Sequence, residues 1–199
     1  TRVRSSAASD VYKRQSQYST DMLVNKHRSL TEDFEPEDLV SIDSEYAADD
    51  TQAGARIAVN AFISMYKAAK KDGYDLVINS SYRSYQDQVE LCDSYRQLYG
   101  DNYVKNYVAQ PGFSEHQTGL SFDIGSRNSN IFAQSPEYEW IQENAHKYGF
   151  IQRFPSKYEA ITGFRAEPWH YRYVGKEIAT YIYENDISFE EYYAIFLDD

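Results

Sequence analysis

Two histidines and two acidic residues occur in patterns that could build a metal site. His116 and Asp123 lie seven residues apart in SEHQTGLSFDIGS, and Glu167 and His170 lie three apart in AEPWHYRYVG. Two imidazoles and one carboxylate form the kind of three-ligand set that zinc accepts while keeping a fourth position open. Glu167 is then a spare carboxylate that could take a proton from water. The combination predicts a metallohydrolase centre.

The first pair requires a turn to converge. On one regular strand, His116 and Asp123 would face opposite sides of the sheet. Proline and glycines in the preceding loop disfavour a helix. We therefore expect His116 on the loop and Asp123 on a strand, with Gly119 allowing the backbone to fold between them. The simpler alternative is a hydrogen-bonded histidine and an aspartate that caps a turn.

The second pair also requires an irregular backbone. On an ideal strand Glu167 and His170 would point to opposite faces, and Pro168 suggests a strand start or a bulge that brings them together. The alternative is an aromatic edge strand with an exposed glutamate and a half-buried histidine. His27 lies in a basic stretch and His146 on a predicted helix, so we expect both outside the metal site.

Arg83, in SSYRSYQDQ, lies where a predicted strand meets a helix cap. A guanidinium fixed there could clamp a carboxylate through two hydrogen bonds, which suits an enzyme that recognises a free C-terminus. Gln88, about one helical turn further on, could bind the substrate peptide. The alternatives are a surface salt bridge for Arg83 and a plain surface role for Gln88.

The predicted elements mix helices and strands without a regular βαβ rhythm, which favours an α+β fold with a small antiparallel sheet flanked by helices. Residues 1–21 are interpreted as a disordered leader or an artefact of sequence assembly, and residues 22–199 as one domain. Helices are expected at 50–71, 84–99, 136–150, 176–186 and 188–196, and strands at 76–82 and 120–126, with an extended segment at 167–175.

Composition narrows the function classes. The chain has 199 residues and a formal charge of −11, and no run of Lys and Arg forms a stripe, which argues against nucleic acid and anionic membranes as main partners. The single cysteine excludes an internal disulfide and a thiolate zinc cluster. No signal peptide or apolar segment of membrane-spanning length is visible. We expect a monomer that is cytoplasmic or the mature part of an exported protein.

At these motifs the chain resembles the VanY-like D-alanyl-D-alanine carboxypeptidases, a group of LAS zinc metallopeptidases that includes the L,D-carboxypeptidases of the LdcB type. The resemblance covers roughly residues 22–195. The pattern SxHxxGxxxD is matched at Ser114, His116, Gly119 and Asp123, and ExxH is matched at Glu167 and His170. Ser121 is a small departure, because relatives often carry alanine there.

The resemblance implies a LAS, hedgehog-like fold and one zinc ion per chain, although manganese or cobalt could occupy the same ligand set. It implies His116, Asp123 and His170 as metal ligands and Glu167 as the general base. It also implies that Arg83 binds substrate or stabilises the oxyanion, with Ser114 and Gln88 as further substrate contacts.

The implied function is a zinc-dependent D-alanyl-D-alanine carboxypeptidase. Such an enzyme removes the C-terminal D-alanine from peptidoglycan stem peptides by direct attack of zinc-bound water. Alternatives are an L,D-carboxypeptidase acting on tetrapeptide stems, a less favoured endopeptidase, and a non-catalytic cell-wall-binding module. The resemblance places the protein outside the membrane or in the cell envelope of a bacterium, with the native signal or anchor not in this chain.

Overall fold

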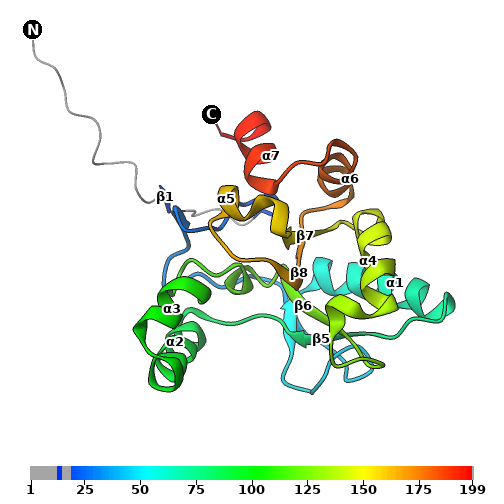
Figure 1. Ribbon diagram of the computed structural model, residues 1–199, viewed down its shortest axis with the longest axis horizontal. Helices are drawn as coiled ribbons and strands as arrows, with labels where there is room; N and C mark the ends of the chain where they lie inside the picture. Colours follow the sequence, from blue (N-terminus) through cyan, green and yellow to red (C-terminus); the bar gives the residue numbers. More distant parts are fainter. Residues whose placement is uncertain (1–12, 15–18, 199) are drawn as a thin grey trace, which may run out of the picture.

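A four-stranded antiparallel sheet forms the centre of the computed structural model, which describes residues 13–14 and 19–198, with side chains from residue 19 onward (Figure 1). The strand order is β5-β6-β8-β7, and every neighbouring pair is antiparallel. The strands are β5 (Leu76–Ser80), β6 (Ser121–Ser126), β7 (Phe150–Phe154) and β8 (Glu167–Tyr173). The predicted α+β class and small antiparallel sheet are confirmed.

Two short ribbons accompany this sheet. β1 (Lys13–Arg14) pairs in parallel with β2 (Arg28–Ser29), and β3 (Leu39–Ser41) pairs antiparallel with β4 (Ala53–Ala55). Most of the leader expected over residues 1–21 lies outside the described residues, so that interpretation stays a prediction.

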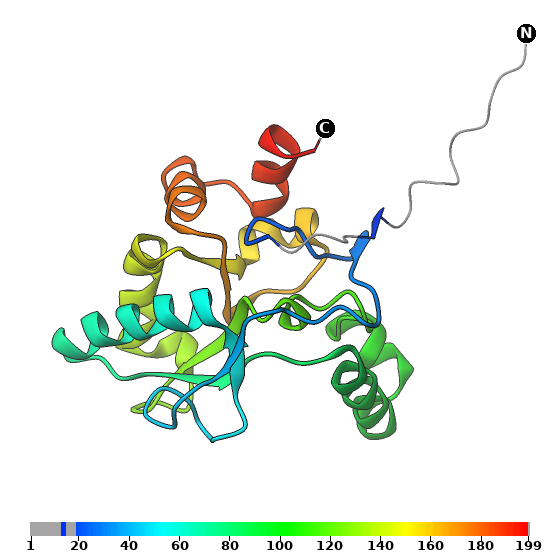
Figure 2. The same cartoon turned by 180° about the vertical axis from the view of Figure 1, so that it is seen from behind.

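Helices lie on both sides of the central sheet. In Figures 1 and 2, α1 and α4 lie on one side, the α2–α3 hairpin projects on the other, and α6 and α7 lie beyond β7. The helices are α1 (Arg56–Lys71), α2 (Tyr85–Tyr99), α3 (Asp101–Tyr107), α4 (Pro136–Asn144), α5 (Glu159–Thr162), α6 (Lys176–Asn185) and α7 (Phe189–Phe196). Among the described residues no helix is both long and apolar enough to cross a membrane.

The main core lies between α1 and the sheet. Ala58, Phe62, Met65 and Ala69 are fully buried and recur every three or four residues, so they form one apolar face of α1. Phe62 meets Phe122 of β6 edge-on, with ring centroids 6.1 Å apart. Because β6 is held from this side by the core, the face of the strand that carries Asp123 is fixed.

Some element boundaries differ from those predicted. The first helix begins at Arg56 rather than residue 50, because residues 53–55 pair with β3. The helix expected over 136–150 ends at Asn144 and continues as a short 3-10 helix, η3 (Ala145–Tyr148), before β7. The sequence did not predict β7 or α3. The capping box predicted at Ser84 is present and starts α2.

Gly119 makes the turn between the loop of His116 and strand β6. Its backbone is left-handed, with φ of 66°, and its amide donates to the carbonyl of His116. A Cβ at this position would lie 3.0 Å from the backbone nitrogen of Ala55. Glycine is therefore required both by the torsion angle and by the close approach of β4.

We predict that Gly119→Ala lowers the free energy of unfolding of the metal-free protein by about 1–3 kcal/mol, because the left-handed torsion and the contact with Ala55 both add cost. Gly73→Ala is the matched control, since Gly73 also has positive φ but a Cβ there would meet nothing within 4 Å. Denaturant unfolding of the two variants should show the larger loss for Gly119→Ala. Equal losses would mean that the contact with β4 is unimportant.

Candidate metal centre

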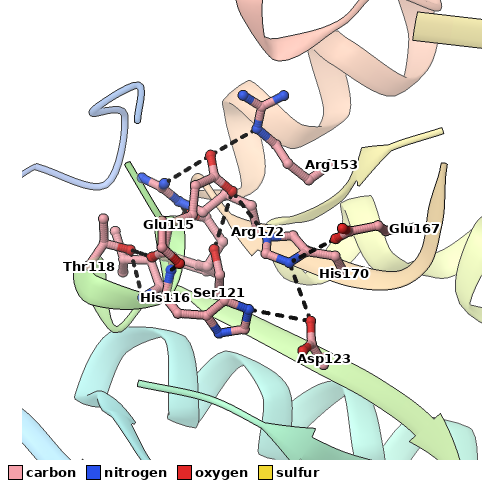
Figure 3. Close-up of polar contacts among 12 residues, drawn as sticks. Glu115, His116, Thr118, Ser121, Asp123, Arg153, Glu167, His170 and Arg172 are labelled. Atoms are coloured by element: carbon pink, nitrogen blue, oxygen red, sulfur yellow. Dashed lines mark hydrogen bonds and ion pairs between the residues drawn. The ribbon is translucent and has the colours of Figure 1, made fainter. Parts of the chain in front are cut away.

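The three predicted metal ligands converge in the structure (Figure 3). His116 lies on the 3-10 helix η1 (Glu115–Thr118), and Ser114 caps that helix by accepting a hydrogen bond from the His116 amide. Asp123 on β6 is the direct cross-strand neighbour of His170 on β8. The site is therefore built on a sheet pair, with the first histidine supplied by the loop before it.

Their ligand atoms are spaced to share a cation. One ligand atom from each of the three residues lies within 4.8 Å of the others. Oδ1 of Asp123 is 3.4 Å from Nε2 of His116 and 3.3 Å from Nδ1 of His170. That oxygen is buried and has no hydrogen bond among the described residues. A buried carboxylate oxygen facing two ring nitrogens fits a zinc ion at this point.

The outer nitrogen of each histidine is already occupied. Nδ1 of His116 lies 2.7 Å from the carbonyl oxygen of Ser81, and Nε2 of His170 lies 3.2 Å from Oε2 of Glu115. Carbonyl and carboxylate oxygens only accept, so each outer nitrogen must carry the hydrogen. The remaining nitrogens, Nε2 of His116 and Nδ1 of His170, are thereby directed at Asp123. This is the arrangement that orients histidines toward metals.

Glu115 is a buried anion between two buried cations. Its Oε1 lies 2.8 Å from Nε of Arg153 and 3.4 Å from a terminal nitrogen of Arg172, and all three side chains are almost fully inaccessible. Arg153 also forms two hydrogen bonds, of 2.8 and 2.5 Å, with Glu190 at the start of α7. The two carboxylates and two guanidiniums balance in charge, which makes their burial tolerable.

Burial and these neighbours set the charge of both histidines. Burial lowers the pKa of His170, but the adjacent carboxylates of Asp123 and Glu115 outweigh it and raise that pKa to about 9. Burial, with the nearby Arg83, lowers the pKa of His116. The raised pKa of His170 favours its protonated form in the metal-free site. Since a bound metal must displace the proton from the ligating nitrogen, metal affinity should rise with pH through the pKa of His170.

Glu167 is brought to the site by the predicted irregularity of β8. The register between β7 and β8 shifts here, because Gln152 pairs with Tyr171 whereas Phe154 pairs with Glu167. Glu167 consequently shares a face with His170, and Oε2 lies 3.6 Å from Nδ1 of that histidine. Burial raises the pKa of Glu167 above its ordinary value, although His170 and Arg83 oppose the shift. A raised pKa suits a carboxylate that must accept and return a proton.

Arg83, Gln88 and Ser114 line the same cavity as the metal ligands and Glu167, with a volume of about 180 Å³. Burial lowers the pKa of Arg83, whereas Asp123 and Glu167 raise it, and its Nε has no hydrogen bond among the described residues. The side-chain amide nitrogen of Gln88 donates a hydrogen bond to the carbonyl oxygen of Ala109. The side-chain oxygen of Gln88 is buried and has no hydrogen-bond partner in the described part of the chain.

The other two histidines lie apart from the cluster. His146 stacks on Tyr183 with ring centroids 3.8 Å apart, so it is a packing residue, and His27 is exposed. The sequence interpretation missed Glu115, Ser81, Arg153 and Arg172, which hold the histidines. The only local signal was the acidic residue directly before His116. Arg153 comes from β7, and Arg172 lies on β8 two residues after His170, without a pattern that would mark its role.

A comparison with known families finds a match over residues 53–176 to the model of the VanY family, described as D-alanyl-D-alanine carboxypeptidase. The Bacillus subtilis (strain 168) protein YodJ is 44% identical over 179 residues, which cover 86% of this chain and 66% of YodJ. This chain therefore spans about two thirds of the length of that relative.

Two solved structures resemble most of this chain. The LdcB LD-carboxypeptidase has a TM-score of 0.80 at 43% identity, covering 86% of this chain and 84% of the other. A variant of the vancomycin resistance D,D-pentapeptidase VanY, solved with Zn(II), has a TM-score of 0.75 at 32% identity, covering 88% of this chain and 99% of the other.

We predict that Glu115→Gln weakens zinc binding by about 10–100-fold, because the carboxylate that orients His170 loses its charge. Glu190→Gln is the matched control, since it removes a carboxylate from the same network without touching His170. Both variants should unfold more easily, and only the first should lose zinc affinity strongly. Chelator competition gives the affinity, and denaturant unfolding of the metal-free proteins gives the stability. Equal affinities in the two variants would contradict this role.

Proposed function

Because the chain belongs to the VanY family of D-alanyl-D-alanine carboxypeptidases, we propose that it is a zinc-dependent enzyme that removes the C-terminal D-alanine from peptidoglycan stem peptides. The observation that carries the proposal is the meeting of a three-ligand cluster, a spare carboxylate and an arginine in one cavity. A non-catalytic binding module would need only the three metal-binding side chains, whereas this site also contains Glu167 and Arg83.

The chemistry follows from where these groups lie. A bound zinc ion supplies Lewis acidity, which activates water and polarises a carbonyl. Glu167, at the edge of the ligand cluster, accepts the proton of the attacking water as the new carbon–oxygen bond forms. It then returns that proton to the nitrogen of the leaving D-alanine as the carbon–nitrogen bond breaks. No covalent bond to the protein is needed in this scheme.

Arg83 supplies the positive charge of the cavity, whereas Glu167 supplies a proton acceptor. Its guanidinium faces the same cavity and is attracted to Asp123 and Glu167. A guanidinium can bind a substrate carboxylate through two hydrogen bonds, which selects a free C-terminus, or stabilise the developing oxyanion. The unpaired oxygen of Gln88 can accept a hydrogen bond from a substrate amide, and the Ser114 hydroxyl also lies within the cavity lining.

The two candidate activities, D,D- and L,D-carboxypeptidase, differ in the peptide bond that is cleaved. The family description favours a D,D-carboxypeptidase acting on pentapeptide stems. The higher identity to LdcB favours the second candidate, an L,D-carboxypeptidase acting on tetrapeptide stems. Both release D-alanine with the same catalytic groups, and they differ in the residue that precedes it.

The test measures D-alanine release from pentapeptide and tetrapeptide by zinc-loaded protein, with and without chelator. Chelator-sensitive release from pentapeptide alone supports the D,D-enzyme, and release from tetrapeptide alone supports the L,D-enzyme. Bound zinc without release from either peptide would instead favour a cell-wall-binding module or an endopeptidase, and would contradict the proposal.

We predict that Glu167→Gln lowers kcat by about 100-fold or more while zinc stays bound, because the amide can no longer accept the proton of water. Glu143→Gln, at an exposed position on α4, is the matched control and should leave kcat unchanged. Initial rates and metal content of both variants provide the check. Near-normal turnover of Glu167→Gln would remove Glu167 from the role of general base.

A further inference from the structure

Four tyrosines of the α2–α3 hairpin form a continuous stack of rings. Tyr95 and Tyr99 lie four residues apart on α2, and Tyr103 and Tyr107 lie four apart on α3, so each pair shares one face of its helix. Successive ring centroids are 5.8, 4.7 and 5.0 Å apart. We call these four residues the tyrosine surface. The hairpin that carries it projects from the body of the protein (Figures 1 and 2).

The outer part of this surface faces solvent. Tyr99, Tyr103 and Tyr107 are 59%, 37% and 50% exposed, and the neighbouring Leu98 is 69% exposed. Exposed apolar side chains that gather in one place can mark an interaction site, whereas single scattered ones are ordinary surface. Since each ring is held by its neighbours, little side-chain freedom remains to be lost when a ligand binds.

The tyrosine surface is continuous with the candidate catalytic cavity. Tyr95 and Tyr107 line that cavity together with Arg83 and Glu167, and Tyr99 and Tyr103 extend the stack beyond it. The cavity, at about 180 Å³, is smaller than the roughly 300–1,000 Å³ that a drug-sized ligand fills. It can enclose the end of a peptide, so the rest of a polymeric substrate must lie along the rim.

We propose that the tyrosine surface binds sugar rings of the glycan strand to which the stem peptide is attached, an inference that rests on the proposed function. A sugar ring offers a flat face of C–H groups to an aromatic face, and its hydroxyls can bond to the phenolic tips. A neutral glycan is not repelled by a protein with a net charge of −11, whereas an anionic wall polymer is.

The dimensions agree with this placement. A four-residue stem peptide spans at most about 14 Å when fully extended. The seven-residue helix α3 is about 10 Å long, and its last turn, at Tyr107, already borders the cavity. A sugar at the far end of the stem can therefore reach Tyr103 and Tyr99 while the C-terminal residue occupies the cavity.

The first test is direct binding of tetra-N-acetylchitotetraose, a neutral N-acetylglucosamine tetramer, measured by calorimetry. We expect the double variant Tyr99→Ala/Tyr103→Ala to bind the saccharide about tenfold more weakly than the natural chain. The affinity of the natural chain should change little with salt concentration, because the saccharide is neutral. Tyr183→Ala is the matched control, because Tyr183 is an equally exposed tyrosine on α6. No binding by the natural chain, or equal binding by the double variant, overturns the inference. This measurement needs no catalysis, so it fails or succeeds independently of the proposed function.

The second test compares hydrolysis of a disaccharide-linked stem peptide with hydrolysis of the same peptide free. The double variant should show a KM raised about fivefold on the linked substrate with unchanged kcat, and less than a twofold change on the free peptide. Equal losses on both substrates would assign the tyrosines to the peptide and overturn the glycan assignment. Self-association that disappears in the double variant, without saccharide binding, would assign the surface to a second copy of the chain and overturn it as well.

Discussion

The buried carboxylate of Glu115 is the constraint on which the site depends. It holds the outer nitrogen of His170 on one side and the guanidinium of Arg153 on the other, at 3.2 and 2.8 Å. Removing one member of such a network leaves an uncompensated charge in the interior, at a typical cost of about 3–5 kcal/mol. Because Arg153 also binds Glu190, the same network ties the metal site to the C-terminal helix α7.

Arg172 extends this network to the beginning of the described domain. Its guanidinium donates to the carbonyl oxygens of Met22 and Thr20 and lies 3.4 Å from Glu115. Segments near both ends of the chain are thus tied to the centre of the sheet through two buried arginines. Charge balance explains why these cations are tolerated inside, while the apolar core between α1 and β6 supplies the main driving force for folding.

The candidate catalytic groups and the tyrosine surface, for which we propose glycan binding, lie on different parts of this framework. The central sheet holds Asp123, His170 and Glu167 in place. Register shifts between neighbouring strands bring these three side chains to the same face of the sheet. The α2–α3 hairpin, by contrast, projects from the sheet and borders the cavity with aromatic side chains. The candidate metal centre and the proposed polymer surface therefore place separate demands on the fold.

The sequence by itself identified the residues of the candidate ligand cluster, the nearby carboxylate of Glu167, the fold class and the turn at Gly119, because each leaves a local signal of residue type and spacing. It predicted the irregularity at Pro168 for the same reason. It could not predict β7, the end of α4 or the roles of Arg153, Arg172 and Ser81. Those depend on which strands become neighbours, and a buried ion pair between residues 38 positions apart leaves no local pattern. Only the tertiary structure decided how the histidines are held, because the pairing of β7 with β8 and the packing of η1 against them bring Arg153, His170 and Glu115 together.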